Sequence, residues 1–314
     1  ALYVVLFPQL VAGPIVRYST VAEEIVRRSE GVDDMAEGLQ RFLFGLAKKV
    51  LLANQMGLIA DAAFSQTAPR LSMGLAWLGV IGYTLQIYFD FSGYSDMAIG
   101  LGRMFGFEFL ENFNYPYISR SATEFWRRWH ISLGTWFRDY LYIPLGGSRV
   151  NRGRVVLNLL IVWAATGIWH GASWNFLLWG LFYFVLLVFE KFWFGKVLDR
   201  APRWVGHVYG LLLILVGWAL FAVEDIGALG LYLKALFGFG SGLLDESFLY
   251  YLRNYLPALI IAGVAATPLA AKYWRKLPEK VRAVLLPLLL AFGLFLSTAY
   301  LVDGTYNPFL YFRF

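Results

Sequence analysis

Residues 155–189 read VVLNLLIVWAATGIWHGASWNFLLWGLFYFVLLVF and contain no Asp, Glu, Lys or Arg. A helix needs about 20 apolar residues to cross the hydrocarbon core of a bilayer. The nearest basic residues on either side are Arg154 and Lys191, and small residues interrupt the run after His170, in the sequence HGAS. The stretch therefore predicts two apolar helices that leave one membrane face and return to it, with His170 at the turn between them.

Uncharged runs of about 16 to 20 residues also occur elsewhere, and such runs cross or nearly cross a bilayer; they cover residues 71–89, 205–223, 256–271 and 283–302. Only 15% of the 314 residues are charged, against about 25% in soluble domains. The runs are too long for barrel strands, and a backbone in lipid must pair its own polar groups. We predict an all-α, polytopic transmembrane protein. Because no repeat or low-complexity linker divides it, we expect one domain over residues 1–314.

Other segments predict helices of different kinds. Pro8, Gly13 and Pro14 interrupt residues 1–16, so we expect a bent or re-entrant segment there. Residues 33–64 have the apolar spacing of a long amphipathic helix. The chain starts at Ala1 inside an apolar run, so we expect residues of the natural protein to precede it.

The distribution of basic residues predicts a topology. The net charge of +6 comes from Lys and Arg at the ends of the apolar runs, which is typical of membrane proteins and does not indicate nucleic-acid binding. We expect residues 149–154, 191–203 and 272–282 on the cytoplasmic side and residues 224–246 outside. The chain has no Cys and three His; we therefore expect no thiol nucleophile and no metal site.

The turn at His170 is expected to be recessed. About 16 residues on each side of it span roughly 24 Å, less than the hydrocarbon thickness of about 30 Å. An ionisable side chain at membrane depth indicates a functional site, and histidine suits proton transfer near neutral pH. The alternative, a neutral histidine bonded to a neighbouring helix, is equally compatible with these observations.

A second histidine lies in residues 121–142, which we expect to be one helix because Ser121 and Glu124 form a capping-box pattern. His130 would share a face of that helix with Trp126 and Phe137. An interfacial amphipathic helix would explain the Trp and Arg residues of this segment, but it explains a histidine on the apolar side poorly.

Asp90 and Asp96 are the acidic residues of the sequence YFDFSGYSDMAIG. Six positions apart, they point in different directions on a helix. They fit a proton path or a cation site. We favour a structural interpretation, in which they pair with Arg103, Arg127 or Arg128 and the helix breaks at Gly93.

Several long motifs resemble those of the membrane-bound O-acyltransferase family, and most closely its bacterial alginate O-acetylation branch. They are FPQLVAGPIVRYS (7–19), FDFSGYSDMAIGLGRMFGF (89–107), NFNYPYIS (112–119), EFWRRWHISLGTWFRDYLYIPLGGSR (124–149), GIWHGASWNFLLWG (167–180) and YNPFLYFRF (306–314). The resemblance runs along the whole chain. The family has further N-terminal helices, so the chain resembles the C-terminal part of its members.

The resemblance implies acyl transfer from a thioester to a hydroxyl, in a site where a cytoplasmic donor tunnel meets an external acceptor funnel. His170 matches the catalytic histidine of the WHG motif, and His130 matches the second active-site histidine, in WHIS. No bound cofactor is implied; acetyl-CoA is the expected co-substrate. We expect the remaining candidates to bind substrate: Trp126, Trp129 and Trp169 as channel walls, and Arg128 and Arg138 as partners for a phosphate-bearing donor.

For this branch, the resemblance implies a protein of the bacterial inner membrane, embedded in lipid. It would work with periplasmic acetyltransferase partners to acetylate an exported polysaccharide, alginate or a similar polymer. Acyl transfer to peptidoglycan and D-alanyl transfer to teichoic acid are related alternatives. A transporter using Asp90 and Asp96, or a scaffold that docks periplasmic partners, are the alternatives outside enzymes. No nucleic-acid partner is expected.

Overall fold

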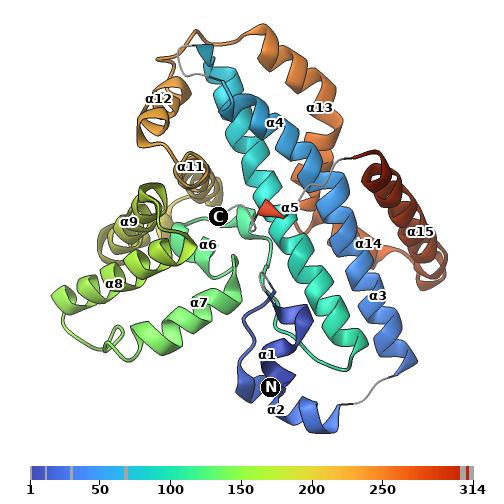
Figure 1. Ribbon diagram of the computed structural model, residues 1–314. Helices are drawn as coiled ribbons and strands as arrows, with labels where there is room; N and C mark the ends of the chain where they lie inside the picture. The colour runs from blue at the N-terminus through green and yellow to red at the C-terminus, as the bar shows by residue number, and fades with distance from the viewer. Residues whose placement is uncertain (1, 11–12, 29–30, 67–69, 305–308, 311–314) are drawn as a thin grey trace.

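The computed structural model describes residues 2–10, 13–28, 31–66, 70–304 and 309–310 (Figure 1). In these ranges the chain forms helices and loops, with one isolated bridge between Phe113 and Trp129. This confirms the all-α prediction. Most of the C-terminal motif 306–314 and residues 11–12 of the N-terminal motif lie outside the described residues.

The N-terminal segment is broken, as its prolines predict. It contains the short helices α1 (Leu2–Val5) and η1 (Phe7–Gln9), followed by α2 (Tyr18–Arg27). Pro8 lies inside η1 and is buried. None of these three helices is long enough to cross a membrane.

Two long helices form the centre of the molecule. The first is continuous over Val32–Phe64 and consists of α3 (Val32–Ala47), a π-helical segment η2 (Lys48–Ala53) and α4 (Asn54–Phe64). The second is α5 (Met73–Met104), which packs along it. Figure 1 shows this pair between α8, α9 and α11 on one side and α15 on the other.

Glycines let α3 and α5 pack backbone against backbone. A Cβ on Gly38 would lie 2.5 Å from the carbonyl oxygen of Gly100, and a Cβ on Gly45 would lie 2.5 Å from that of Gly93. No side chain fits at such distances. The predicted helix break at Gly93 is wrong, because α5 continues through it to Met104. Gly93 serves this close packing instead.

Within the described residues, six helices are long and apolar enough to cross a membrane, namely Val32–Phe64, Arg152–His170, Trp174–Arg200, Arg203–Ala222, Glu246–Ala265 and Glu279–Asp303. The chain is therefore a multi-pass membrane protein. α5 is not among the six, although its first half is uncharged. Protein, rather than lipid, encloses it: its side chains are buried along most of its length, Asp90 and Asp96 included.

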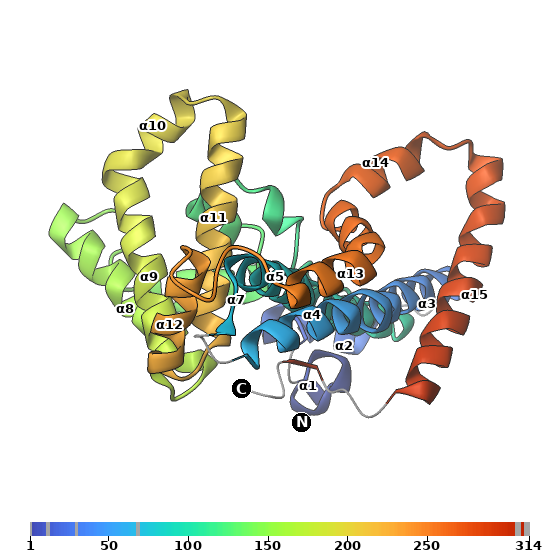
Figure 2. The same cartoon turned by 90° about the horizontal axis from the view of Figure 1, so that it is seen from above.

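The C-terminal half contains most of these helices; its elements are α8 (Arg152–His170), α9 (Trp174–Phe189), η6 (Glu190–Phe194), α10 (Gly195–Arg200), α11 (Arg203–Ala222), α12 (Ile226–Leu236), α13 (Glu246–Ala265), α14 (Leu269–Lys276) and α15 (Glu279–Asp303). In Figure 2, α9, α11 and α15 run up the picture and the α3–α4 helix and α5 cross them. The basic helices α10 and α14 lie at one end and α12 at the other, in agreement with the predicted alternation of sides.

Residues 121–142 do not form the single helix that we expected. They form α6 (Ala122–Trp126), α7 (Ile131–Phe137) and the π-helical segment η5 (Arg138–Tyr142). The predicted cap is present, because the Ser121 hydroxyl accepts a hydrogen bond from the Glu124 N–H at 3.0 Å. The first helix ends at Trp126, and His130, directly before α7, adopts left-handed backbone, with φ 46° and ψ 54°.

Candidate functional site

His170 is the last residue of α8, and the turn Gly171–Ser173 leads directly into α9. Glycine fixes this hairpin, since a Cβ on Gly167 would lie 2.6 Å from the carbonyl oxygen of Phe176. The prediction of a histidine between two helices is confirmed. Ile168 is 63% exposed and Trp174 69% exposed, whereas His170 is half-buried. His170 therefore turns inward from an otherwise exposed helix end; its depth in a bilayer stays a prediction.

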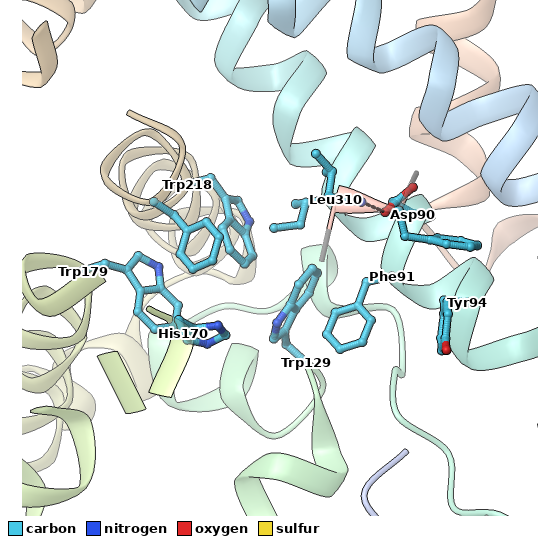
Figure 3. Close-up of a pocket in the computed structure, with 11 residues that line it drawn as sticks. Asp90, Phe91, Tyr94, Trp129, His170, Trp179, Trp218 and Leu310 are labelled. Atoms are coloured by element: carbon cyan, nitrogen blue, oxygen red, sulfur yellow. Dashed lines mark hydrogen bonds between the residues drawn. The ribbon is translucent and has the colours of Figure 1, made fainter. Parts of the chain in front are cut away.

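The His170 imidazole faces a narrow pocket between α5, α9 and α11 (Figure 3). Its ring centroid lies 5.0 Å from that of Trp179 and 5.2 Å from that of Phe221, both nearly perpendicular to it. The pocket is mostly apolar, and its lining consists of Ile87, Asp90, Phe91, Tyr94, Trp129, His170, Trp179, Trp218, Phe221, Phe309 and Leu310. An imidazole in such surroundings meets few water molecules, which suits proton transfer to or from a bound substrate.

His130 lies beside this pocket and is 4% exposed. Its ring is 4.7 Å from the ring of Phe91, a pocket residue, and 6.1 Å from the ring of Trp169. The Trp169 ring is also 5.0 Å from the His170 ring. The two histidines, 40 positions apart in the sequence, thus both lie close to the Trp169 ring. Burial lowers the pKa of His130 well below its ordinary value, and the charge of a protonated His170 would lower it further.

A buried polar cluster holds the unusual backbone at His130. Asn112 is 1% exposed, and its Oδ1 accepts hydrogen bonds from the Ser132 hydroxyl at 2.9 Å and the Ser132 N–H at 3.2 Å. Its backbone oxygen accepts the Ile131 N–H at 3.0 Å. Left-handed backbone costs a non-glycine residue roughly 1–2 kcal/mol. Such strain persists only where the surroundings impose it, and it is common at functional sites.

A sequence model of the membrane-bound O-acyltransferase family matches residues 1–231, a range that includes both histidines. The chain belongs to this family.

Several relatives have functions assigned to them. The chain is 46% identical to a probable alginate O-acetylase of Azotobacter vinelandii over 249 residues, which are 78% of this chain and 49% of that protein. It is 38% identical to a peptidoglycan O-acetyltransferase of Helicobacter pylori over 76% of this chain and 46% of the relative. Identity to a teichoic acid D-alanyltransferase of Bacillus subtilis is 27%, over 65% of this chain and 53% of the relative. The chain spans about half the length of the curated relatives it matches.

The three tryptophans predicted to bind substrate occupy three different positions. Trp129 is 4% exposed and lines the His170 pocket. Trp169 lies between the two histidines and is 43% exposed. Trp126 lies behind the pocket wall, with its ring 4.7 Å from that of Trp163 and 4.9 Å from that of Tyr183. Only the first two are placed to contact a substrate at His170.

The two arginines predicted to attract the donor lie away from this pocket. Arg128 donates to Glu124 at 3.0 Å and to the carbonyl oxygen of Asn114 at 3.1 Å, and so ties α6 to the preceding loop. Arg138 is exposed and donates to Asp139 at 2.7 Å. Hydrogen bonds from Arg138 and Arg17 lower the pKa of Asp139 to about 2. The donor-binding role of Arg128 and Arg138 stays a prediction.

The structural interpretation of Asp90 and Asp96 is confirmed, but their partners differ from those expected. Asp90 pairs with Lys49 at 2.5 Å, and Asp96 pairs with Arg41 at 2.6 Å and with Lys48. All three basic residues belong to the helix over residues 32–64. No local sequence pattern predicts that this helix packs against α5. Asp90 also lines the His170 pocket.

Asn112 and the C-terminal Phe309 and Leu310 are site residues that the sequence analysis missed as individuals. The motifs containing them, NFNYPYIS and YNPFLYFRF, did point to these regions. Nothing in the local sequence indicates that Asn112 supports the backbone at His130, because that contact joins a loop to a turn 20 residues away.

Proposed function

We propose that this protein is an O-acyltransferase that moves an acetyl group from a thioester towards hydroxyls of an exported polysaccharide, alginate or a similar polymer. The observation that carries the proposal is the His170 imidazole, which is turned into an apolar pocket beside the buried His130. The printed functions of the relatives, acetyl transfer to alginate and to peptidoglycan, support the reaction class and an envelope polymer as the acceptor.

The chemistry follows from the properties of a neutral imidazole. A hydroxyl is a weak nucleophile unless a base removes its proton. His170 takes that proton as the hydroxyl oxygen attacks the thioester carbonyl carbon; the C–O bond forms, the C–S bond breaks, and the proton passes to the departing sulfur. His130 is neutral at pH 7 because its pKa is lowered, and one of its ring nitrogens carries a proton that can stabilise charge on the carbonyl oxygen.

The apolar lining contributes by excluding water. A thioester exposed to water near a general base would be hydrolysed instead of transferred. Trp129, Trp179 and Trp218 close the pocket on the side of the protein core. This explains why the site is built from aromatic side chains, although the reaction itself needs only a few polar groups.

The donor, the partners and the membrane are parts of the same proposal. We propose acetyl-CoA as the donor, a cytoplasmic co-substrate rather than a bound cofactor. We also propose the bacterial inner membrane as the location, with periplasmic acetyltransferase partners that deliver the acetyl group to the polymer. The basic ends at α10 and α14, taken as cytoplasmic, support this orientation. Against a transporter, Asp90 and Asp96 are each paired with a basic residue, which leaves them poorly suited to a proton path.

The test measures O-acetyl content of the exported polysaccharide in cells that lack the native gene. They are complemented with the full-length protein carrying His170 or His170→Ala, at equal membrane abundance. We expect acetylation to fall about 10²- to 10⁴-fold, the usual contribution of a general base. His207→Ala is the matched control, because His207 is exposed on α11 and remote from the pocket. Persistent acetylation in His170→Ala would rule out His170 as the base.

A further inference from the structure

Two residues from the C-terminal end of the chain form part of the His170 pocket. Phe309 and Leu310 both line it, and Leu310 is 8% exposed (Figure 3). They reach the pocket from beyond α15, which ends at Asp303 on the other side of α5. Part of the pocket lining is therefore supplied by two residues that are distant along the chain from the other lining residues.

The Asp90 side chain binds the main chain of Leu310. Its Oδ2 accepts the Leu310 N–H at 2.7 Å, a hydrogen bond between residues 220 positions apart. Its Oδ1 accepts a hydrogen bond from the Lys49 ammonium group at 2.5 Å. Asp90 is 2% and Lys49 7% exposed. A buried carboxylate is costly unless charged and hydrogen-bonding partners surround it, so this ion pair and the bound segment stabilise each other.

Phe309 adds side-chain contacts at the same point. The Lys49 ammonium nitrogen lies 4.9 Å from the centre of the Phe309 ring, close enough for a cation–π interaction. The Tyr94 ring meets the Phe309 ring edge to face, at 4.8 Å. Helix α5 supplies Asp90 and Tyr94, and η2 supplies Lys49. Two elements of the central helix pair thus hold two adjacent residues of the C-terminal segment.

We propose that Asp90, held in place by Lys49, is a positioning residue that seats Phe309 and Leu310 in the wall of the His170 pocket. The hydrogen bond to the Leu310 N–H holds the main chain in place, and the contacts of the Phe309 ring with Lys49 and Tyr94 hold that side chain against the central helices. Without this seat the pocket loses the part of its lining that Phe309 and Leu310 supply, and an acyl group bound beside His170 becomes more accessible to water. The catalytic consequence rests on the proposed function, whereas the seating itself does not.

Asp96 provides an internal comparison. It lies six positions after Asp90 on the same helix, is 7% exposed and also forms ion pairs with basic residues of the neighbouring helix. It does not line the pocket. If Asp90 only held the two helices together, Asp90 and Asp96 variants would have the same effects.

The experiment uses the absence of native cysteines. Leu310→Cys keeps the main-chain N–H and introduces one thiol, whose rate of reaction with a maleimide is measured on the detergent-solubilised protein. We expect Asp90→Ala to raise this rate about tenfold or more, because the segment opens more often. Asp96→Ala should leave it unchanged. Leu236→Cys, 1% exposed in α12, reports general loosening and should react at the same rate with and without Asp90→Ala.

An unchanged rate at position 310 in Asp90→Ala would overturn the proposal, and so would equal increases at positions 310 and 236.

A second arm measures kcat and KM for acyl transfer by the full-length protein: Asp90→Ala should lower kcat/KM about tenfold and Asp96→Ala should not. The two proposals fail separately. If the His170→Ala variant were fully active, the proposed function would fail, while the labelling result at position 310 would still decide the seating.

Discussion

His170 ends a regular helix, whereas His130 stands in left-handed backbone at the break between two short helices. The first is placed by a hairpin whose helices approach closely at Gly167. The second is placed by Asn112, which bonds to the residues just after it. The comparison indicates two different sensitivities: the position of His170 depends on local packing, and that of His130 depends on a polar contact with a distant loop.

After His170→Ala, the largest effect is expected from removing the His130 ring. Both His130→Ala and His130→Gly should lower acyl transfer about 10²-fold or more if the imidazole takes part in the reaction. Their stabilities should differ, because glycine adopts positive φ without strain. We expect His130→Gly to be about 1 kcal/mol more stable than His130→Ala, after the greater freedom of glycine in the unfolded chain is subtracted. Thermal unfolding in detergent measures this difference; equal stabilities would show that the backbone at His130 is unstrained.

The next effect is expected from the support of His130. Asn112→Ala leaves the buried Ser132 N–H without its acceptor, which costs about 1–3 kcal/mol. Activity should fall with it, because the strained turn can relax. Ser95→Ala is the control, since it removes only the bond from Asn112 Nδ2 to the Ser95 hydroxyl, at 3.1 Å. If the two variants lose equal stability and activity, the Asn112–Ser132 contact has no special role at His130.

The difference between the two histidines also marks what could be predicted from the sequence. The helices around His170 were predictable, because long uncharged runs and a glycine-containing turn are local signals. The break at His130 was not, because the sequence around it has helical spacing and a correct helix cap at Ser121. The tertiary contact with Asn112 overrides that local preference. Similarly, the pairing of Asp90 and Asp96 was predictable in kind, but their partners depend on which helix packs against α5.

A smaller effect concerns pH. The pKa of His130 is lowered by burial, so below its ordinary pKa of about 6.5 the unfolded chain binds a proton that the folded chain does not. The free energy of unfolding should therefore fall as the pH decreases from about 6.5, by at most about 1.4 kcal/mol per pH unit, until the pH reaches the lowered pKa. Above pH 7 this contribution vanishes. Unfolding temperatures between pH 7.5 and 5 should fall less steeply for His130→Gln than for the parent protein; parallel curves would contradict a buried, neutral His130.

The smallest effect is expected at Arg138. This residue belongs to the same sequence motif as His130, and its replacement tests whether it also takes part in the reaction. Arg138 is exposed, and its partner Asp139 keeps the ion pair with Arg17 at 2.5 Å when Arg138 is replaced. Arg138→Gln should therefore change stability by less than about 0.5 kcal/mol, as is usual for exposed ion pairs. Because Arg138 lies outside the His170 pocket, we also expect an unchanged kcat; an unchanged KM for the thioester donor would contradict the predicted donor-binding role of Arg138. A raised KM with normal kcat would instead assign Arg138 to the entry path of the donor, and would extend the functional region from the two histidines to the exposed end of η5.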